Sequence, residues 1–496
     1  MKLRKITALF LLFGMLLSLA ACGKTTEDTP ADNAGEVQST AEETVPAEET
    51  GEFDYREGVK DSLGDYNFGG TDFHICYTSE QMQEPYFATE MDGTTVNDAV
   101  YSRTITIEDR FNVKITNTDT GGNWNEVAEA VRVSTSAGAS AYDLALAHTF
   151  IGLTGLMTSG YLYNWYDVPA VGLEADWWNQ NIAQTLTIGD KLYVEANDYI
   201  YQRPMVIYFN KEMIEDFTLD NPYDLVYDGT WTWDKLREMS EAVATDLNGD
   251  GIRDENDRYG FGMTLGWQAI SVLHSQGMRI TSINDDGTYS FRSYEDEKMF
   301  NIFNNFYDLL YNSGNMFYNI IWTVDQGAVN GYTPLFENNQ LLFNYSNTEL
   351  LPRFREIELS FGILPLPKYD EKQDGYYSMA DTQMLIVPAD AKDIEMTGVI
   401  SEALAVESYK KVVPAVYETM FANKYLRDEE SYDMFMITRG GLVYEAIWTY
   451  GEGSDLVYAL PNLMNSKSAD LASYYKARKN ANESALNRVV EKVLAQ

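Results

Sequence analysis

The stretch Met205-Val-Ile-Tyr-Phe-Asn-Lys-Glu-Met213 decides the fold class. Its first five residues form a short apolar run typical of a strand, and Asn210 and Lys211 begin a helix directly after it. The same alternation recurs along the chain on both sides of this stretch. A chain that alternates strands with helices in this way predicts an α/β body with open, mixed sheets.

Apolar runs, helical spacing and capping residues place the other predicted elements. Further strands are predicted over residues 73–77, 112–115, 142–148, 191–196, 259–263 and 341–344. One helix is predicted over 96–111, capped by Thr94 or Thr95, and another over 233–245, capped by Thr232. From Gly398 onward the chain is predicted to be mostly helical.

The composition excludes several classes of protein. The chain has 496 residues, with 76 Asp and Glu against 36 Lys and Arg, and a formal net charge of −40. This acidic excess argues against binding nucleic acid, which needs a basic surface, and against docking on anionic lipid through a basic patch. The 2 cysteines and 3 histidines leave little scope for a disulfide scaffold or a zinc site. Aromatic residues reach 13%, which favours stacking on a ligand.

The N-terminal residues predict export and a lipid anchor. Basic residues precede an almost unbroken apolar run from Ile6 to Leu19, as in a secretory signal over residues 1–21. The following Leu19-Ala-Ala-Cys22 resembles the bacterial lipobox, whose cysteine receives a diacylglycerol group before cleavage. Cys22 is therefore expected to anchor the mature chain, through stable two-chain lipidation, to the outer face of the cytoplasmic membrane. The alternative is an ordinary signal peptide with a chance cysteine.

A disordered acidic tether is predicted over residues 22–57. Between Gly23 and Glu52 the chain has nine Asp and Glu against Lys24 alone, and no aromatic residue. Such a segment buries too little apolar surface to fold. The remaining body, residues 58–496, exceeds what one core usually supports, which predicts two lobes. The first lobe is expected at about 65–198 and 373–440, and the second at about 202–370 with C-terminal helices over 441–496.

Several segments in a fixed order resemble the extracellular solute-binding proteins of bacterial ABC importers, the class of maltose and oligosaccharide receptors. They are Gly189-Asp-Lys-Leu-Tyr-Val-Glu-Ala196 followed by residues 205–213, Gly229-Thr-Trp-Thr-Trp-Asp-Lys-Leu236 followed by Arg258-Tyr-Gly-Phe-Gly262, and Leu341-Leu-Phe-Asn-Tyr-Ser346 with Phe361-Gly-Ile-Leu-Pro-Leu-Pro367. The resemblance spans roughly residues 65 to 450. Each piece alone is unspecific, and the order and spacing of the pieces carry the resemblance.

The resemblance implies a two-lobed periplasmic-binding-protein-like fold of class II, α/β with mixed sheets flanked by helices and a hinge cleft between the lobes. Such a protein closes around a solute and delivers it to the permease subunits of an ABC importer. The solute is expected to be a sugar or oligosaccharide, because aromatic and carboxylate side chains are plentiful and cationic ones few. The resemblance also implies a monomer that is not an enzyme and has no catalytic residues.

The resemblance places solute contacts in loops after strands and in the segments that cross between the lobes. The expected contacts are His148, Thr149, Asp198, Tyr201, Trp267, Tyr345, Asn347 and Asp381. A carboxylate beside an aromatic ring, as at Asp198 and Tyr201, suits sugar hydroxyls and the face of a sugar ring. His148 and Trp267 have alternative uses as structural or core residues. The neighbouring Trp177 and Trp178 cannot both face one ligand, so at least one of them is expected to be buried.

The segment from Asp246 to Asp257 fits a twelve-residue calcium loop. Oxygen donors fall at the ligand positions, with Gly251 at the sharp turn. The expected ligands are Asp246, Asn248, Asp250, the Ile252 carbonyl, Asp254 and Asp257. The last position holds Asp where the EF-hand has Glu, which resembles the calcium loop of dockerin modules. The alternative is a solvated turn rich in Asp and Gly. An extracellular site of this kind binds Ca²⁺ at about 10⁻⁴ to 10⁻³ M and is structural.

Two other functions stay open on the sequence. One is an extracellular carbohydrate-active hydrolase that uses a pair of carboxylates, although the chain has no Gly-x-Ser-x-Gly or His-Glu-x-x-His signature. The other is a surface adhesion lipoprotein. A glycan panel separates the three functions, because a receptor binds without releasing product and an enzyme releases product.

Overall fold

The structure is a computed structural model of the chain, and its folded body belongs to one compact unit, Asp54–Gln496. It describes residues 56, 58–79, 86–266, 268–285, 287–291, 296–319, 331–351, 353–381, 383–417, 428–451 and 456–496. The predicted signal peptide, Cys22 and almost all of the predicted tether lie outside the described residues. In the described part of the chain, no helix is long and apolar enough to cross a membrane.

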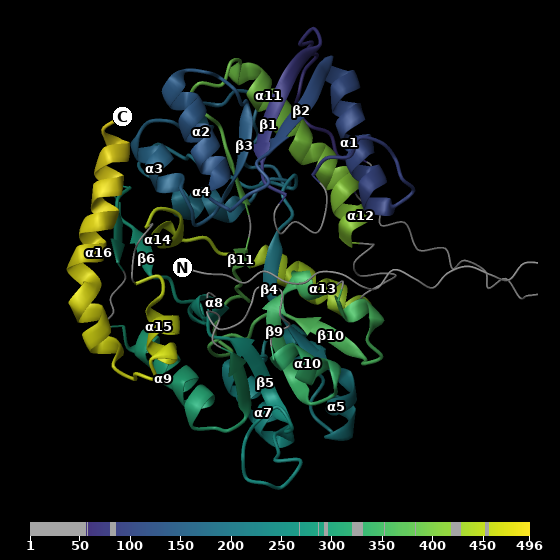
Figure 1. Ribbon diagram of the computed structural model, residues 1–496, viewed down its shortest axis with the longest axis vertical. Helices are drawn as coiled ribbons and strands as arrows, with labels where there is room; N and C mark the ends of the chain where they lie inside the picture. The colour runs from purple at the N-terminus through teal and green to yellow at the C-terminus, as the bar shows by residue number, and fades with distance from the viewer. Residues whose placement is uncertain are drawn as a thin grey trace, which may run out of the picture. The chain divides into compact units, whose positions relative to one another are not determined.

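The smaller of the two main sheets has the strand order β12-β3-β1-β2 and lies in the upper half of Figure 1. Its strands are β1 (Thr71–Tyr77), β2 (Val113–Asp119), β3 (Leu144–His148) and β12 (Gln383–Ile386). β1 runs parallel to β2 and β3, and β12 runs antiparallel to β3. Between the parallel strands the chain forms α1 (Thr95–Phe111) and α2 (Glu126–Ala137), so this sheet is built from βαβ units.

The larger sheet has the order β10-β4-β9-β5-β8, with β11 paired to β4. Its strands are β4 (Arg203–Asn210), β5 (Tyr259–Thr264), β8 (Met316–Asn319), β9 (Leu341–Asn347), β10 (Phe361–Leu364) and β11 (Ala380–Asp381). β4 is antiparallel to β9, β10 and β11, whereas β5 is parallel to β8 and β9, so the sheet is mixed. Two hydrophobic clusters, one containing Phe209 and one containing Tyr208, draw on neighbouring residues of β4, so each face of the sheet is covered.

The remaining described elements are mostly helices. They are α3 (Leu153–Thr158), η1 (Trp165–Asp167), α4 (Gln180–Leu186), α5 (Lys211–Asp216), α6 (Pro222–Tyr227), α7 (Trp233–Val243), α8 (Gln268–Ser275), the hairpin β6 (Thr281–Ile283) and β7 (Tyr289–Phe291), α9 (Glu297–Tyr311), α10 (Tyr332–Glu337), η3 (Thr348–Leu350), η4 (Arg353–Glu356), α11 (Ile394–Glu407), the π-helix η5 (Ser408–Val412), α12 (Val413–Tyr417), α13 (Glu429–Gly440), α14 (Ala446–Thr449), α15 (Ala459–Asn465) and α16 (Leu471–Leu494). The α/β class and the mostly helical C-terminal part are confirmed.

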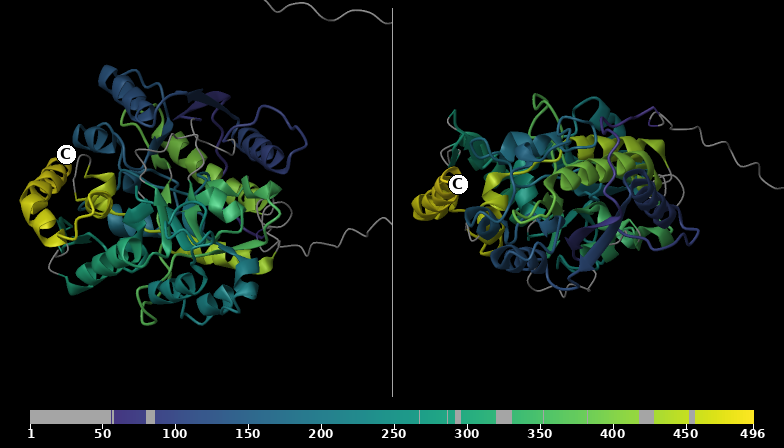
Figure 2. Two further views of the ribbon diagram at one scale, coloured as in Figure 1. Left: turned by 60° about the horizontal axis from the view of Figure 1, so that its bottom comes forward. Right: turned by 90° about the horizontal axis from the view of Figure 1, so that it is seen from above.

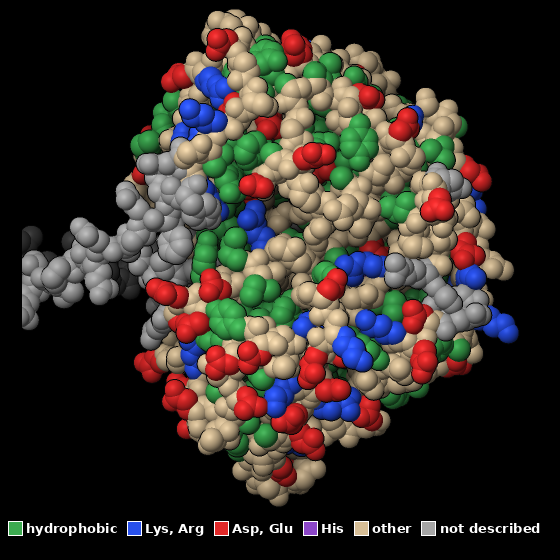
Figure 3. Space-filling view, turned by 180° about the vertical axis from the view of Figure 1, so that it is seen from behind, with side chains coloured by type: hydrophobic (Ala, Val, Ile, Leu, Met, Phe, Trp, Pro, Cys, Tyr) green, Lys and Arg blue, Asp and Glu red, His purple; other side chains and the backbone are tan. Residues whose placement is uncertain are grey.

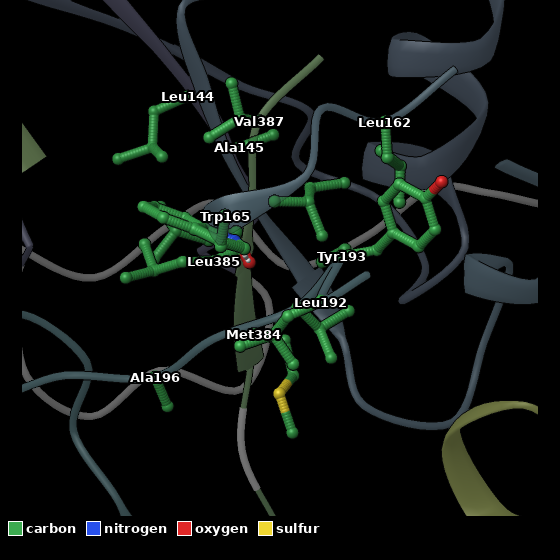
Figure 4. Packing of buried hydrophobic residues seen from close by; sticks show 14 of the residues in the cluster. Leu144, Ala145, Leu162, Trp165, Leu192, Tyr193, Ala196, Met384, Leu385 and Val387 are labelled. Atoms are coloured by element: carbon green, nitrogen blue, oxygen red, sulfur yellow. Dashed lines mark hydrogen bonds between the residues drawn. The ribbon is translucent and has the colours of Figure 1, made fainter. Parts of the chain in front are cut away.

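One predicted strand is wrong. Residues 191–196 are extended but pair only at isolated positions, Lys191 with Ile188 and Glu195 with Leu385. Gly189, in the left-handed region at φ 62°, turns the chain back on itself just before this segment. The segment therefore packs into the core of the smaller sheet without joining its ladder. Figure 4 shows the neighbouring contact, where the Trp165 indole N–H donates to the Leu385 carbonyl at 3.2 Å.

Several segments connect the two sheets. Residues 197–202 lead from the core of the smaller sheet into β4, and β11 precedes β12 on the way back. The rod formed by α11, η5 and α12 starts in the core of the smaller sheet and ends in a core of the larger one. Residues 441–445 then lead from α13 to α14. These segments are the crossings on which a hinge between two lobes depends.

The C-terminal part divides between the lobes differently from our prediction. α13, expected in the first lobe, contributes Met434 and Phe435 to the cores of the larger sheet. α16, expected in the second lobe, begins in a core of the larger sheet at Leu471 and ends in the core of the smaller sheet at Val493. Both views of Figure 2 show α16 along one side of the body.

Candidate functional site

His148 and Thr149 lie where β3 ends, as predicted. His148 is the last residue of β3, and both side chains are buried. The Phe150 backbone N–H donates to Nδ1 of His148 at 3.1 Å, so a neutral His148 carries its proton on Nε2. The His148 ring lies 4.6 Å from the Trp124 ring and 5.4 Å from the Phe150 ring, measured between centroids. The end of β3 therefore carries an aromatic cluster.

This cluster continues across to the second lobe. Phe150 packs edge-on against Trp448 of α14 at 5.9 Å, and Trp448 lies 4.3 Å from His274 of α8. We call Trp124, His148, Phe150, Trp448 and His274 the aromatic row. The row starts beside the smaller sheet and ends in α8, whose neighbours belong to the larger sheet. It thus runs through the region between the two sheets.

Trp448 has an unused donor. Its side chain is 3% exposed, and its indole N–H finds no acceptor in the part of the chain that the structure describes. Buried indole N–H groups in folded proteins almost always have a partner. A solute oxygen or an ordered water is the kind of acceptor that this position lacks.

His274 and Glu445 lie buried beside each other at the far end of the row. Nδ1 of His274 lies 2.9 Å from the Ile270 carbonyl, which can only accept, so Nδ1 carries a proton. Nε2 of His274 faces Oε1 of Glu445 at 3.3 Å. Glu445 also accepts from the N–H groups of Ile280 at 2.6 Å and Thr281 at 3.3 Å. The carboxylate thereby joins the start of β6 to the residue that precedes α14, whereas Nε2 of His274 makes no hydrogen bond to the described residues.

The first crossing contains the predicted Asp198 and Tyr201. Asp198 forms a buried ion pair with Arg439 of α13. Burial raises the pKa of Asp198, and the charge of Arg439 opposes that rise. Tyr201 stacks on Tyr86 with ring centroids 5.1 Å apart. One oxygen of Asp198 and the amide nitrogen of Asn197 are buried without a hydrogen-bond partner among the described residues.

Tyr345 and Asn347 lie within β9, so the prediction that they follow a strand is wrong. Tyr345 is fully buried, contacts Ser271 through its hydroxyl and donates to the Gln268 carbonyl at 3.1 Å. Asn347 accepts from the Glu349 N–H at 3.1 Å. Both side chains are used in internal hydrogen bonds, which argues against solute contact at these positions.

The structure describes neither the Trp267 side chain nor the Asp381 side chain, two of the predicted solute contacts. Trp267 lies outside the described residues. The backbone of Asp381 pairs with Arg203 in the β11–β4 ladder, at the second crossing, but its side chain is outside the description.

The predicted calcium loop joins α7 to β5. The two carboxylate oxygens of Asp246 accept from the Gly249 and Gly251 N–H groups at 2.7 and 2.8 Å, and these bonds lower the pKa of Asp246. The Asp257 carboxylate is fully buried and accepts from the Leu247 N–H at 3.0 Å. Among the residues described, no three His, Cys, Asp or Glu side chains meet closely enough to hold a metal ion. The calcium site stays a prediction that rests on the spacing.

Sequence reasoning missed Trp124, Phe150, Trp448 and Glu445. Nothing local marks them, because they lie on two turns, the end of a loop and a four-residue helix. Their common property is a position between the two sheets, which only the fold reveals. The one available signal was the high aromatic content, and it does not say which rings gather.

Figure 3 shows one face of the molecule, with acidic side chains spread over both halves. The surface seen there agrees with the acidic composition and with the absence of a broad basic surface on this face.

Comparison with models of protein families and with curated proteins finds no match. Comparison with solved structures finds similar folds at low identity. UgpB from Mycobacterium tuberculosis, in complex with glycerophosphocholine, is 15% identical with a TM-score of 0.56, covering 85% of this chain and 99% of its own. A sugar transporter from Rhizobium etli in an open conformation is 14% identical with a TM-score of 0.55, covering 86% and 99%. An ABC substrate-binding protein from Listeria monocytogenes, in complex with cycloalternan, is 12% identical with a TM-score of 0.51, covering 86% and 98%. The chain has the two-lobed fold of these proteins.

Proposed function

We propose that this chain captures an extracellular solute, a sugar or oligosaccharide, by closing two lobes around it, and that it passes the solute to an ABC permease. One observation carries the proposal. The aromatic row runs from the end of β3 to α8, between the sheets, and includes a buried indole N–H that has no acceptor among the described residues. Aromatic faces and a few fixed polar groups are what a solute-binding cleft needs.

The similar folds support this reading and also define its alternatives. The Listeria protein is named with cycloalternan, a carbohydrate, whereas the Mycobacterium protein is named with glycerophosphocholine, which carries a phosphate. A phosphate ligand calls for a cationic or amide-rich site. The aromatic row contains no Lys or Arg, and the Glu445 carboxylate lies at one end of it. These features favour an uncharged glycan.

The test uses the full chain and three probes: maltotetraose, cycloalternan and glycerophosphocholine. We expect at least one glycan to raise the melting temperature and change tryptophan fluorescence, with the glycan recovered intact by chromatography. Recovery of cleaved glycan would favour the hydrolase instead. A response to glycerophosphocholine alone would overturn the sugar assignment, and no response to any probe would count against solute capture.

A matched pair of variants tests whether the Trp448 indole N–H in the aromatic row binds the glycan. Trp448→Phe keeps an aromatic ring and removes the N–H, and we expect it to weaken glycan binding by roughly 5- to 150-fold, the effect of about 1–3 kcal/mol for one buried hydrogen bond. Trp177→Phe removes an indole N–H that already donates to Glu402 at 2.8 Å, away from the row. It should leave glycan affinity unchanged. Equal glycan affinities for wild type and Trp448→Phe would show that the aromatic row is not part of the binding site.

We propose, on the lipobox alone, that Cys22 is lipidated and holds the body on the outer face of the membrane. Cells that express Cys22→Ser should release the chain into the aqueous phase of a detergent partition, whereas the wild type partitions into detergent. Equal partitioning of both would reject the anchor.

We also propose that residues Asp246–Asp257 bind a structural Ca²⁺. The support is chemical, because every donor in the expected set is a hard oxygen and the spacing is that of a calcium loop.

A further inference from the structure

The rod formed by α11, η5 and α12 has a π-helical segment in its middle. α11 is buried in the core of the smaller sheet, and α12 contributes Val413 and Val416 to a core of the larger sheet. Figure 1 shows the rod running beside α1. η5, residues Ser408–Val412, lies between these two ends. Single π-turns inside helices are rare and often mark functional bends. η5 is therefore the place where this connection between the lobes can bend.

Arg103 of α1 touches η5 and the first crossing at once. Its guanidinium donates to the Ser408 hydroxyl of η5 at 3.4 Å and to the Tyr86 carbonyl at 2.5 Å. It also lies over the ring of Tyr199, in the first crossing, at 4.8 Å from the centroid. The side chain is 1% exposed. One buried residue thus contacts both of these connections between the lobes.

Arg103 forms no ion pair with a carboxylate of the described residues, and its Nε has no hydrogen-bond partner among them. Burying a charge costs free energy, and in the described part of the chain the contacts with Ser408, Tyr86 and Tyr199 stabilise it. The planar guanidinium can donate along its edge and stack with its face in the same position, which an ammonium cannot do. The geometry at Arg103 uses both properties.

Neighbouring contacts hold η5 against the same part of the smaller lobe. Lys411 of η5 donates to the Thr106 hydroxyl of α1 at 2.6 Å. Arg56 donates to the Tyr409 carbonyl at 2.7 Å and lies 4.4 Å from the centroid of the Tyr409 ring. The last turns of α1 pack into the core of the smaller sheet through Ile107 and Phe111, so a change in the conformation of η5 would disturb the Arg103 contacts.

We propose that Arg103 couples the two connections, so that η5 and the first crossing change conformation together when the lobes move. The inference rests on lobe closure, which the proposed function includes, but not on the identity of the solute. Arg103 acts here as a positioning residue and touches no solute.

The first experiment measures hydrogen exchange in the full chain without solute. The variants are Arg103→Lys, which keeps the positive charge but loses the planar guanidinium, and the control Arg110→Met. Arg110 lies on the same helix, pairs with Asp61 and is 37% exposed. We expect Arg103→Lys to speed exchange roughly tenfold in residues 197–203 and in residues 408–412, and Arg110→Met to change neither segment. Faster exchange in only one of the two segments, or in neither, would overturn the coupling.

The second experiment measures the distance between the lobes. Spin labels at Ser136→Cys on α2 and Asn304→Cys on α9, in a Cys22→Ser background, report this distance because Cys76 is buried. Arg103→Met should broaden the distance distribution of the solute-free chain under conditions where circular dichroism shows it folded. An unchanged distribution, or equal broadening by Arg110→Met, would overturn the proposal. Neither experiment uses a solute, so failure of the sugar assignment leaves the test intact.

Discussion

Glu402 of α11 holds two neighbouring tryptophans with one carboxylate. One oxygen accepts from the Trp177 indole N–H and the other from that of Trp178, both at 2.8 Å. The second oxygen also accepts from the Gly172 N–H at 3.1 Å. Trp178 is 3% exposed, which confirms the expectation that at least one of the two rings is buried. These tryptophans brace α11 against the start of α4.

Glu402→Ala should therefore lower the free energy of unfolding by about 3–5 kcal/mol, because it leaves the buried Trp178 N–H and two half-buried N–H groups without this acceptor. Urea unfolding followed by tryptophan fluorescence measures the change. Glu395→Ala, at an exposed position on the same helix, should change it by less than about 0.5 kcal/mol. A loss below about 1 kcal/mol for Glu402→Ala would show that the carboxylate is not needed for this packing.

Glu195 predicts a pH dependence of stability. The side chain is 1% exposed, and the structure gives it one hydrogen bond, from the Ala196 N–H at 3.0 Å. Burial raises the pKa of Glu195 well above its ordinary value of 4.5. The folded state therefore binds a proton that the unfolded state releases above pH 4.5. Its contribution to stability is complete below that pH and falls by about 1.4 kcal/mol per pH unit above it, until the folded pKa is reached.

Glu195→Gln keeps the shape and removes the titration. We expect the variant to gain stability relative to the wild type as the pH rises from 4.5 to 7.5, measured by urea unfolding at several pH values. Glu174→Gln, an exposed control, should show no pH-dependent difference. A difference between Glu195→Gln and wild type that stays constant over this range would mean that Glu195 is ionised in the folded chain.

Single residues also show the limits of sequence reasoning. His148 was placed correctly because it ends a short apolar run, and the end of a run is visible in the sequence. Tyr345 was not, because β9 continues to Asn347 and polar residues within a strand look like the start of a loop. Boundary errors of this size move a residue from a loop into the core.

At the scale of elements, capping residues behaved differently at two predicted helix starts. Thr232 caps α7, with its hydroxyl accepting from the Lys235 N–H at 3.2 Å. Thr94 precedes α1, but its hydroxyl donates to Asp92 at 2.7 Å and makes no capping bond. The helix was predictable from its apolar spacing in both cases. The cap was not, because a nearby carboxylate competes for the same hydroxyl.

The loop between α7 and β5 carries the calcium prediction. We expect Ca²⁺ to raise the melting temperature of the full chain with half-maximal effect at about 10⁻⁴ to 10⁻³ M, because the ion replaces repulsion between carboxylates with coordination. Asp250→Ala should abolish the rise. Glu241→Ala, at an exposed position on the preceding helix α7, should keep it. No effect of Ca²⁺ on the wild type would leave the segment as a solvated turn.

The scale of the whole molecule is where the sequence was least informative. The two-lobed α/β plan follows from the alternation of strands and helices and from the resemblance, and the fold agrees with it. The sequence does not show which lobe each C-terminal helix packs in. An amphipathic pattern indicates that one face of a helix is buried, but it does not indicate which core buries that face. In the structure, the two ends of α16 pack in different cores.

α16 therefore predicts how the lobes unfold. Its last turns bury Val489, Val490 and Val493 in the core of the smaller sheet, and the Gln496 side chain donates to the Met157 carbonyl at 2.7 Å. Its first turns belong to a core of the larger sheet, so loss of one lobe strips a helix from the other. We expect the full chain to unfold in a single calorimetric transition.

A chain that ends at Ala481 lacks the part of α16 that reaches the smaller sheet. We expect its calorimetric trace to split, with the lobe of the smaller sheet melting first, because the truncation removes apolar burial from that core alone. Lys492→Ala, an exposed change in the same segment, should keep the single transition of the full chain. If the truncated chain also unfolds in one step, the crossings near the hinge couple the lobes without help from α16.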